Sequence, residues 1–522
     1  MVAASEININ EGASATQMAN AIFGDGVTVT SASYSGWSQS SGIYTGGDTT
    51  SPGVVPGDTG VILSTGRASH FTNSNGQSNQ STNTSTNTPG QSNNAQFNAA
   101  AGTNTYDASY LDINFIPTGD TMTMQFVLSS EEYPEYVNSL YQDFVGVWVN
   151  GSLVEMSVGN GDTDPGNINS GDNENLYVDN TSDQYNTEMD GFTVTLTLTM
   201  DVNPGVVNSI RIGIADVADS SYDSNLLIAG DSIQTVLIAN DDDVALLGNQ
   251  TKTIDVLAND DNSQNSTLTI THINGIAVTA GSTVTLNTGQ TVLLNANGTI
   301  TLTGDGTDED FNFTYTIDNG LNTDTGYVLV EAVPCFVAGT RIRTPRGDVL
   351  VEHLQPGDMV LTEDHGARPL RWIGNRTVAA EGKFAPVHIA AGALGNHEAL
   401  TVSPQHRILM RDPVAELLFG NTEVLVAAKH LVNGDSVTLI EGGEVTYFHL
   451  LFDQHQIIYG NGIASESFLP GPRTSNMFEA EVLEEICALF PEFNPETGDG
   501  YGRPARLPLK DYETQAFMRT AA

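Results

Sequence analysis

The chain has 522 residues and a formal net charge of −45 at pH 7. Residues 1–333 hold 39 acidic and 3 basic side chains, whereas residues 334–522 hold 24 and 15. This acidic field excludes a nucleic-acid partner, which needs a basic footprint. The length predicts three or four domains. No run of about 18 apolar residues predicts a transmembrane segment, and the N-terminus lacks the basic and apolar regions of a cleaved signal peptide.

Residues 1–240 carry the pattern of an all-β sandwich. A short amphipathic helix is predicted over residues 13–23, and alternating strands follow at 27–30, 122–128, 194–198 and 210–214. Residues 72–98 are nearly all Asn, Ser, Thr, Gln and Gly, and we expect a long surface loop or disordered segment there.

Three motifs in this segment carry a resemblance to a known family. They are SSEEYPEY at 129–136, DFVGVW at 143–148 and IADVADSSYDS at 214–224. The segment resembles the bacterial choice-of-anchor L domain, which is found in surface or secreted proteins and has no established catalytic activity. The resemblance therefore implies an extracellular or cell-surface location rather than a chemistry.

The same motifs contain candidate metal ligands. The carboxylates of Glu131, Glu132 and Asp143 could bind calcium, since hard divalent cations prefer clustered carboxylate oxygens. The alternative is that these acidic side chains only solvate loops.

Residues 241–333 form a second, smaller β domain in the pattern of the sequence. DVLANDD at 255–261 precedes two alternating runs that Asn297-Gly298 separates, which predicts a two-residue hairpin turn. Together with FTYTID at 313–318, these features resemble a bacterial cadherin-like or Ig-like repeat. Such repeats are spacers, often with calcium at their ends, so Asp255 and Asp260 are further candidate calcium ligands.

Four motifs mark the next segment: PCFVAGTRI from Pro334, LQPGDMVLT from Leu354, SPQHR from Ser403 and NGIASESFLPG from Asn461. Residues 334–471 thereby resemble a bacterial Hint domain, the self-processing fold of hedgehog proteins and inteins. The resemblance implies an all-β, horseshoe-like fold and an N-to-S acyl shift before Cys335. Residues 472–522 are a tail in which helical spacing places Cys487 on a packed face.

The residue types fit that chemistry. The Cys335 thiol is the candidate nucleophile, and His406 is the candidate donor of a proton to the scissile nitrogen, with Ser403 hydrogen-bonding the same peptide. Asp453 and His455 are candidates for orienting or deprotonating groups in the later step. The alternative is that Cys335 is a buried thiol that acts as a small hydrophobic side chain.

Two departures limit the reaction. Glu466 and Ser467 stand where an intein has its terminal His-Asn, so self-cleavage rather than protein splicing is expected, and Pro334 replaces the glycine of hedgehog proteins. The chain is interpreted as a surface precursor that cleaves itself at Pro334–Cys335, with no cofactor for the cleavage. An adhesin-like protein with an inactive Hint domain is the alternative. The surface ligand and the acceptor nucleophile are not identified by the sequence.

Overall fold

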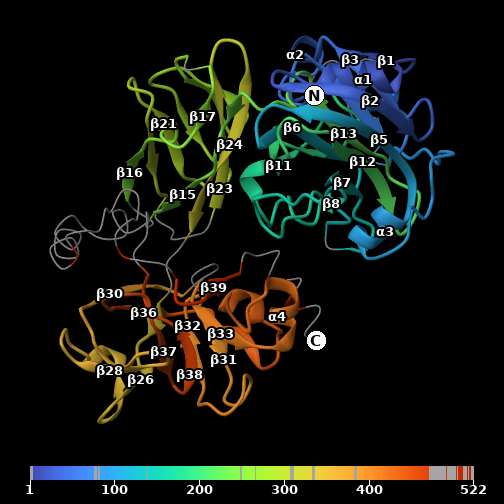
Figure 1. Ribbon diagram of the computed structural model, residues 1–522. Coiled ribbons are helices and arrows are strands. Elements are labelled where there is room, and N and C mark those ends of the chain that lie inside the picture. Colours follow the sequence, from blue (N-terminus) through green and yellow to red (C-terminus); the bar gives the residue numbers. More distant parts are fainter. Residues whose placement is uncertain are drawn as a thin grey trace. The chain divides into compact units, whose positions relative to one another are not determined.

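The computed structural model describes residues 4–75, 79, 81, 83–137, 139–246, 250–264, 266–305, 311–331, 335–380, 385–469, 490, 501, 504–509, 514 and 517–518. The protein is mainly β and divides into two compact units (Figure 1). The first contains Met1–Asp242, Thr253–Thr303 and Phe311–Leu329, and the second contains Asp243–Lys252, Gly304–Asp310 and Val330–Ala522. Within the described ranges, every helix is too short or too polar to cross a bilayer. The predicted helix around Cys487 lies outside them.

Helix α1 (Ala15–Ile22) is the helix predicted near the N-terminus, and its first turn shows why it begins there. The Ser14 hydroxyl accepts a hydrogen bond from the Gln17 backbone N–H, and the Gln17 side-chain oxygen accepts one from the Ser14 backbone N–H. This reciprocal cap satisfies amide groups that a helix end leaves unpaired. Met18 and Ile22, four residues apart, are both buried, so one apolar face packs on the core.

The first part of unit 1 is a β-sandwich of two antiparallel sheets (Figure 1). One sheet has the order β1-β3-β4-β13-β6-β10-β9, with β11 also on β6, and the other has the order β2-β5-β12-β7-β8. Their bounds are β1 Asn8–Asn10, β2 Val27–Ser35, β3 Ser41–Thr45, β4 Thr59–Ser64, β5 Thr105–Pro117, β6 Thr121–Ser130, β7 Phe144–Val149, β8 Ser152–Leu153, β9 Tyr177–Asp179, β10 Gly191–Thr193, β11 Leu196–Asp201, β12 Asn208–Val217 and β13 Ser224–Ala229.

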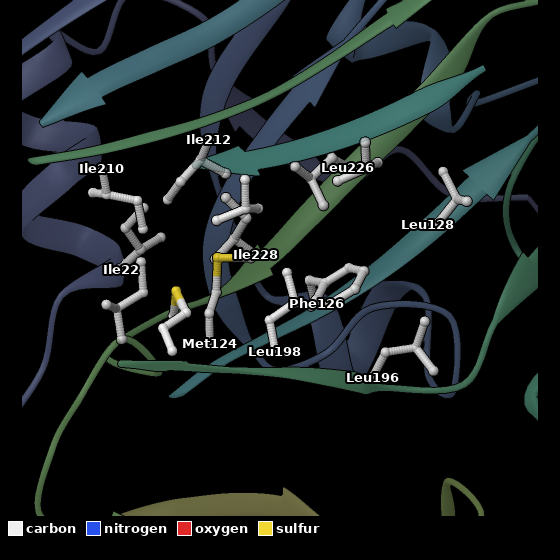
Figure 2. Packing of buried hydrophobic residues seen from close by; sticks show 14 of the residues in the cluster. Ile22, Met124, Phe126, Leu128, Leu196, Leu198, Ile210, Ile212, Leu226 and Ile228 are labelled. Atoms are coloured by element: carbon white, nitrogen blue, oxygen red, sulfur yellow. The ribbon is translucent and has the colours of Figure 1, made fainter. Parts of the chain in front are cut away.

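The core lies between these two sheets, where the inward-facing side chains of both sheets pack together. Figure 2 shows Phe126 of β6 beside Leu198 of β11, with Ile212 of β12 and Leu226 of β13 close by. Alternation places every second residue of a strand on the same face, and in β6 both faces are buried, since all its residues from Met122 to Ser130 are buried. Ile22 brings α1 to the same cluster.

The segment predicted as a loop at 72–98 contains the start of a helix. Helix α3 (Ala95–Ala101) begins there because the Asn94 side chain accepts the N–H groups of Gln96 and Phe97. Phe97 is fully buried, with its ring 4.9 Å from that of Trp148. The polar composition of residues 72–98 predicted a loop and gave no weight to the single aromatic residue Phe97, which packs this helix on the sandwich. Unit 1 also contains the short helix α2 (Gly47–Thr50) and 3-10 turns at Ala68–Phe71 and Glu174–Leu176.

The second part of unit 1 contains the smaller sheets. Their strands are β14 Leu237–Ile238, β17 Asp261–Asn262, β18 Thr269–Ile273, β19 Ile276–Ala277, β20 Thr283–Thr285, β21 Thr291–Leu294, β22 Ile300–Thr303, β23 Phe311–Asp318 and β24 Thr323–Glu331, and β15 (Asp242–Ala245) and β16 (Thr251–Ile254) lie where the chain passes between the units. The predicted hairpin forms between β21 and β22, but its connection runs from Asn295 to Thr299, longer than two residues, with Gly298 at φ +89°.

Buried amide groups join the two parts of unit 1. The Asn175 side chain, 1% exposed, donates to Thr288 Oγ1 at 2.9 Å and to the Asn312 carbonyl at 3.0 Å, and its Oδ1 accepts the Thr288 N–H. The Asn274 amide donates to the Asn175 carbonyl at 2.7 Å. The buried Tyr327 hydroxyl also donates to the backbone of Thr197. The second part therefore packs directly against the sandwich.

Unit 2 contains a six-stranded sheet, β30-β36-β25-β32-β31-β35, and a nine-stranded sheet around β26, β37, β38 and β33. Their bounds are β25 Phe336–Val337, β26 Arg341–Thr344, β27 Gly347–Leu350, β28 Met359–Thr362, β29 Gly366–Pro369, β30 Trp372–Ala379, β31 Val387–Ile389, β32 Leu400–Val402, β33 Arg407–Arg411, β34 Glu423–Ala427, β35 Val437–Leu439, β36 Glu444–Leu451, β37 Ile457–Gly460, β38 Ile463–Glu466 and β39 Leu507–Pro508, with helix α4 at Pro413–Phe419 and 3-10 turns at Val351–His353 and Ala428–Leu431. The two sheets share one apolar core.

Asn175→Ala should destabilise unit 1 by about 2–3 kcal/mol, because it leaves the backbone and hydroxyl partners of a buried amide unpaired. Urea unfolding measures the change. The control is Asn87→Ala, whose exposed side chain makes one hydrogen bond to Ser220 and should cost less than about 0.5 kcal/mol. Equal effects of the two substitutions would show that the amide network does not stabilise the contact.

Candidate functional site

The site is organised by the register of β25, a two-residue strand in the interior of the six-stranded sheet. Phe336 pairs with Val402 of β32 on one side and with Phe448 of β36 on the other. Continuing both antiparallel registers by one residue places Cys335 between Ser403 and His449. Neighbouring residues of adjacent strands point to the same face, so the three side chains gather at one point.

The contacts of Cys335 follow from this register. Its N–H donates to Ser403 Oγ at 2.8 Å, and the Ser403 N–H donates back to the Cys335 carbonyl at 3.0 Å. The thiol sulfur lies 3.6 Å from each ring nitrogen of His449. Cys335 is 6% exposed and packs with Val445 and Tyr447. The residue before it, Pro334, lies outside the described residues.

The His406 ring packs against Phe336 of strand β25. The His406 backbone N–H donates to the Ser403 carbonyl at 3.1 Å, in the turn after β32, and its ring centroid is 4.3 Å from that of Phe336. The imidazole is buried, and among the described residues neither ring nitrogen has a hydrogen-bond partner. Burial lowers the pKa of His406 to about 4, although the nearby Glu466 carboxylate opposes this shift. His406 is therefore neutral at pH 7.

His455 is held by backbone groups. Its Nδ1 accepts the Ala505 N–H at 2.9 Å, so Nε2 carries the proton and donates to the Ser467 carbonyl at 3.1 Å. Glu466 Oε2 is 3.5 Å from the same Nε2. Burial raises the pKa of Glu466, but Arg407 and His455 outweigh it and the net shift is downward. The buried Glu466 is therefore an ionised carboxylate beside the imidazoles.

Asp453 is placed differently from the other candidates. Its carboxylate is exposed and accepts two hydrogen bonds from Arg371, at 2.6 and 3.0 Å. Asp453 and His455, two residues apart, would point to the same face only if they lay in one strand. Strand β36 ends at Leu451, before both of them. The structure therefore brings Cys335, Ser403 and His449 into contact but turns Asp453 towards solvent.

His449 is the site residue that the sequence reasoning missed. It follows Val445 and Tyr447 at period two in β36, and all three are buried. That spacing indicates a common face, but the pairing of β36 with β25 is needed to identify Cys335 as the neighbour.

The candidate calcium ligands separate into three groups. Glu132 lies near Asp143, whose charge contributes to raising its pKa, whereas Glu131 lies near Asp190. Asp260 accepts the Asn240 N–H and the Tyr315 hydroxyl, and Asp255 is exposed. In the described part of the chain, no three Asp, Glu, His or Cys side chains form a group that could hold a metal ion.

The comparisons with known proteins agree with the two halves of this description. Residues 6–234 match the family model described as the choice-of-anchor L domain, and residues 334–472 match that of the Hint domain. No curated protein sequence matches the chain.

Among solved structures, a bacterial intein-like domain from Clostridium thermocellum is 18% identical, covers 26% of this chain and 99% of its own, and has a TM-score of 0.19. The gp41-1 intein is 12% identical, with coverages of 26% and 98% and a TM-score of 0.17. Drosophila OTK extracellular domains 3–5 are 11% identical, with coverages of 52% and 85% and a TM-score of 0.15. Scores this low carry no argument about function.

The two family matches lie in separate segments of the chain, and each coincides with β structure described above. The choice-of-anchor domain indicates a protein of the cell surface. The chain therefore combines a choice-of-anchor L domain with a Hint domain that follows it.

Proposed function

We propose that the Hint domain cleaves the bond between Pro334 and Cys335 by an N-to-S acyl shift and so releases the surface domains that precede it. The observation that carries this proposal is the contact of the Cys335 thiol with the His449 imidazole, beside a serine that holds the Cys335 N–H. A free thiol has a pKa of about 8.5, so attack on an amide requires a base close to the sulfur.

The shift moves one proton and exchanges one bond. His449 takes the proton from Sγ, and the sulfur attacks the carbonyl carbon of Pro334. The carbon–nitrogen bond then breaks, and the Cys335 nitrogen receives a proton and becomes a free amine. Water or an external thiol opens the resulting thioester.

His406 is the proposed donor of the proton to the leaving nitrogen. Because it is buried and neutral at pH 7, it must first receive the proton that leaves the thiol. The ionised Glu466 favours this transfer, since its charge raises the pKa of His406 against the effect of burial. Ser403 accepts the Cys335 N–H and keeps the leaving nitrogen in place.

Ligation of the flanking segments is not part of the proposal. Ser467 stands where an intein has its cyclising asparagine, and its hydroxyl accepts the Gln456 N–H at 3.0 Å. Glu466 is engaged by Arg407 and His455. Neither side chain can cyclise onto the backbone as an asparagine does, so cleavage ends with hydrolysis or with transfer to an acceptor.

Purified wild-type protein should convert to fragments 1–334 and 335–522, faster with added thiol or hydroxylamine, as followed by intact mass. Cys335→Ala should abolish the release because no other group forms the thioester. Ser403→Ala should slow it less than His406→Ala. Cys487→Ala is the matched control and should cleave at the wild-type rate. Folded wild-type protein that stays intact in thiol for days would favour an inactive Hint domain.

His449→Gln should slow cleavage by about 10²–10⁴-fold, the usual contribution of a positioned base. A raised pH should partly restore the rate, because hydroxide then generates the thiolate. His388→Ala, in strand β31 of the same sheet, removes a half-buried imidazole that contacts Thr401 and should have little effect. A wild-type rate and pH profile in His449→Gln would exclude His449 as the base.

The stability of unit 2 should fall in acid because of His406. The folded pKa of about 4 lies below the ordinary histidine pKa of 6.5, so the unfolded chain binds the proton first as the pH falls. The stability is complete above pH 6.5 and is lost between 6.5 and 4. In a Cys335→Ala background, urea unfolding at pH 8 and pH 5 should differ by about 2 kcal/mol more with His406 than with His406→Gln. Equal differences would show that His406 is not buried as a neutral ring.

A further inference from the structure

A pocket of about 320 Å³ opens on one face of the β2-β5-β12-β7-β8 sheet. This volume is at the lower end of the range of roughly 300–1,000 Å³ that is usual for small-molecule sites. The side chains of Leu111 in β5 and Ile212 in β12 belong to the core between the sheets. Asp112 and Arg211, which line the pocket, are their neighbours in the chain and point the opposite way, so the pocket lies on the outer face.

The strand register brings the polar lining residues together in two rows across the sheet. Directly paired residues of neighbouring strands point to the same face. The first row is Ser33 of β2, Asp112 of β5, Arg211 of β12 and Trp148 of β7, and the second row is Ser31 of β2, Asn114 of β5 and Ser209 of β12. All seven residues line the pocket, together with Gln96 of helix α3.

An ion pair fixes the centre of the first row. Arg211 donates to the two carboxylate oxygens of Asp112 at 2.7 and 2.8 Å and to Gln96 Oε1 at 2.9 Å, and its guanidinium lies 4.3 Å from the centre of the Tyr110 ring. A guanidinium has five N–H donors, so two remain for a ligand. The side chains of Arg211 and Asp112 are 23% and 41% exposed, so a ligand can reach both.

The second row adds groups that can donate or accept. The Asn114 amide donates to Ser31 Oγ at 2.9 Å, and both residues are exposed. Among the described residues, Asn114 Oδ1 and the hydroxyl groups of Ser33 and Ser209 make no hydrogen bond within the protein. The outer face therefore holds more hydrogen-bonding capacity than the fold uses.

Trp148 gives the pocket an apolar boundary. A Cβ atom on Gly146 would lie 2.1 Å from the indole, so the glycine lets this ring lie against its own strand. The rings of Phe97 and Phe144 meet the indole edge-on, at 4.9 and 6.5 Å between centroids. These contacts hold the aromatic ring in one place.

We propose that this pocket binds one neutral sugar residue of a glycan. A sugar presents adjacent hydroxyl groups, each of which both donates and accepts, beside apolar C–H groups. The pocket matches them with guanidinium donors, carboxylate and amide acceptors, serine hydroxyls and an aromatic wall.

The charge of the site favours a neutral ligand. The lining contains one acidic and one basic side chain, Asp112 and Arg211, which neutralise each other. The surrounding segment of 39 acidic and 3 basic residues repels anions. The proposal is independent of self-cleavage, because every lining residue lies within unit 1.

The test uses full-length Cys335→Ala protein and titration calorimetry with hexamers of glucose, galactose, mannose and N-acetylglucosamine. At least one of these neutral hexamers should bind, and a hexamer of galacturonic acid, the anionic counterpart, should not. Asn114→Ala should weaken the binding about threefold to tenfold, the usual contribution of one hydrogen bond. Ser33→Trp should abolish it, because the indole would fill the pocket.

The matched control is Thr28→Trp, which places the same side chain at an exposed position of β2 outside the lining. It should bind like the parent protein, and melting temperatures of the variants close to that of the parent show that they are folded. The proposal is overturned if no neutral hexamer binds or if only the galacturonic acid hexamer binds. It is equally overturned if Ser33→Trp and Asn114→Ala both bind as tightly as the parent.

Discussion

The pairing of β25 with β32 on one side and β36 on the other is the constraint on which the candidate site depends. It places Cys335 between Ser403, which binds its N–H, and His449, which touches its sulfur. A slip of one residue in either register would turn the facing side chain to the opposite side of the sheet. The apolar partners of the strand, chief among them the fully buried Val402, hold the register that this chemistry requires.

Burial then sets the protonation states around the thiol. His406 is neutral because desolvation disfavours its charged form, whereas Glu466 is ionised because Arg407 and His455 surround it. The neutral His406 ring can accept a proton for a short time because the Glu466 carboxylate stabilises its charged form. It does not hold that proton at pH 7. In the proposed cleavage, this arrangement would carry the thiol proton to the departing nitrogen.

Burial also sets the protonation states of acidic side chains in the choice-of-anchor domain. Glu132, Asp143 and Asp216 are buried there, and burial is the largest cause that raises the pKa of each carboxyl group. Direct packing between the two parts of unit 1, through Asn175, makes this region a continuous body rather than a sandwich followed by a loose spacer.

The residues alone predicted the mainly β architecture through alternation, and a short motif identified Ser403 and His406 as candidate site residues. They also predicted the helix now seen as α1, because its cap and apolar face are contiguous in the chain. They did not place His449 opposite Cys335, separate Glu131 from Glu132 or show that Asp453 faces solvent. Each of these depends on which strands, distant in sequence, become neighbours and on where each strand ends. Pairing of distant strands is set by burial of the whole core, so it cannot be read from the spacing within one motif.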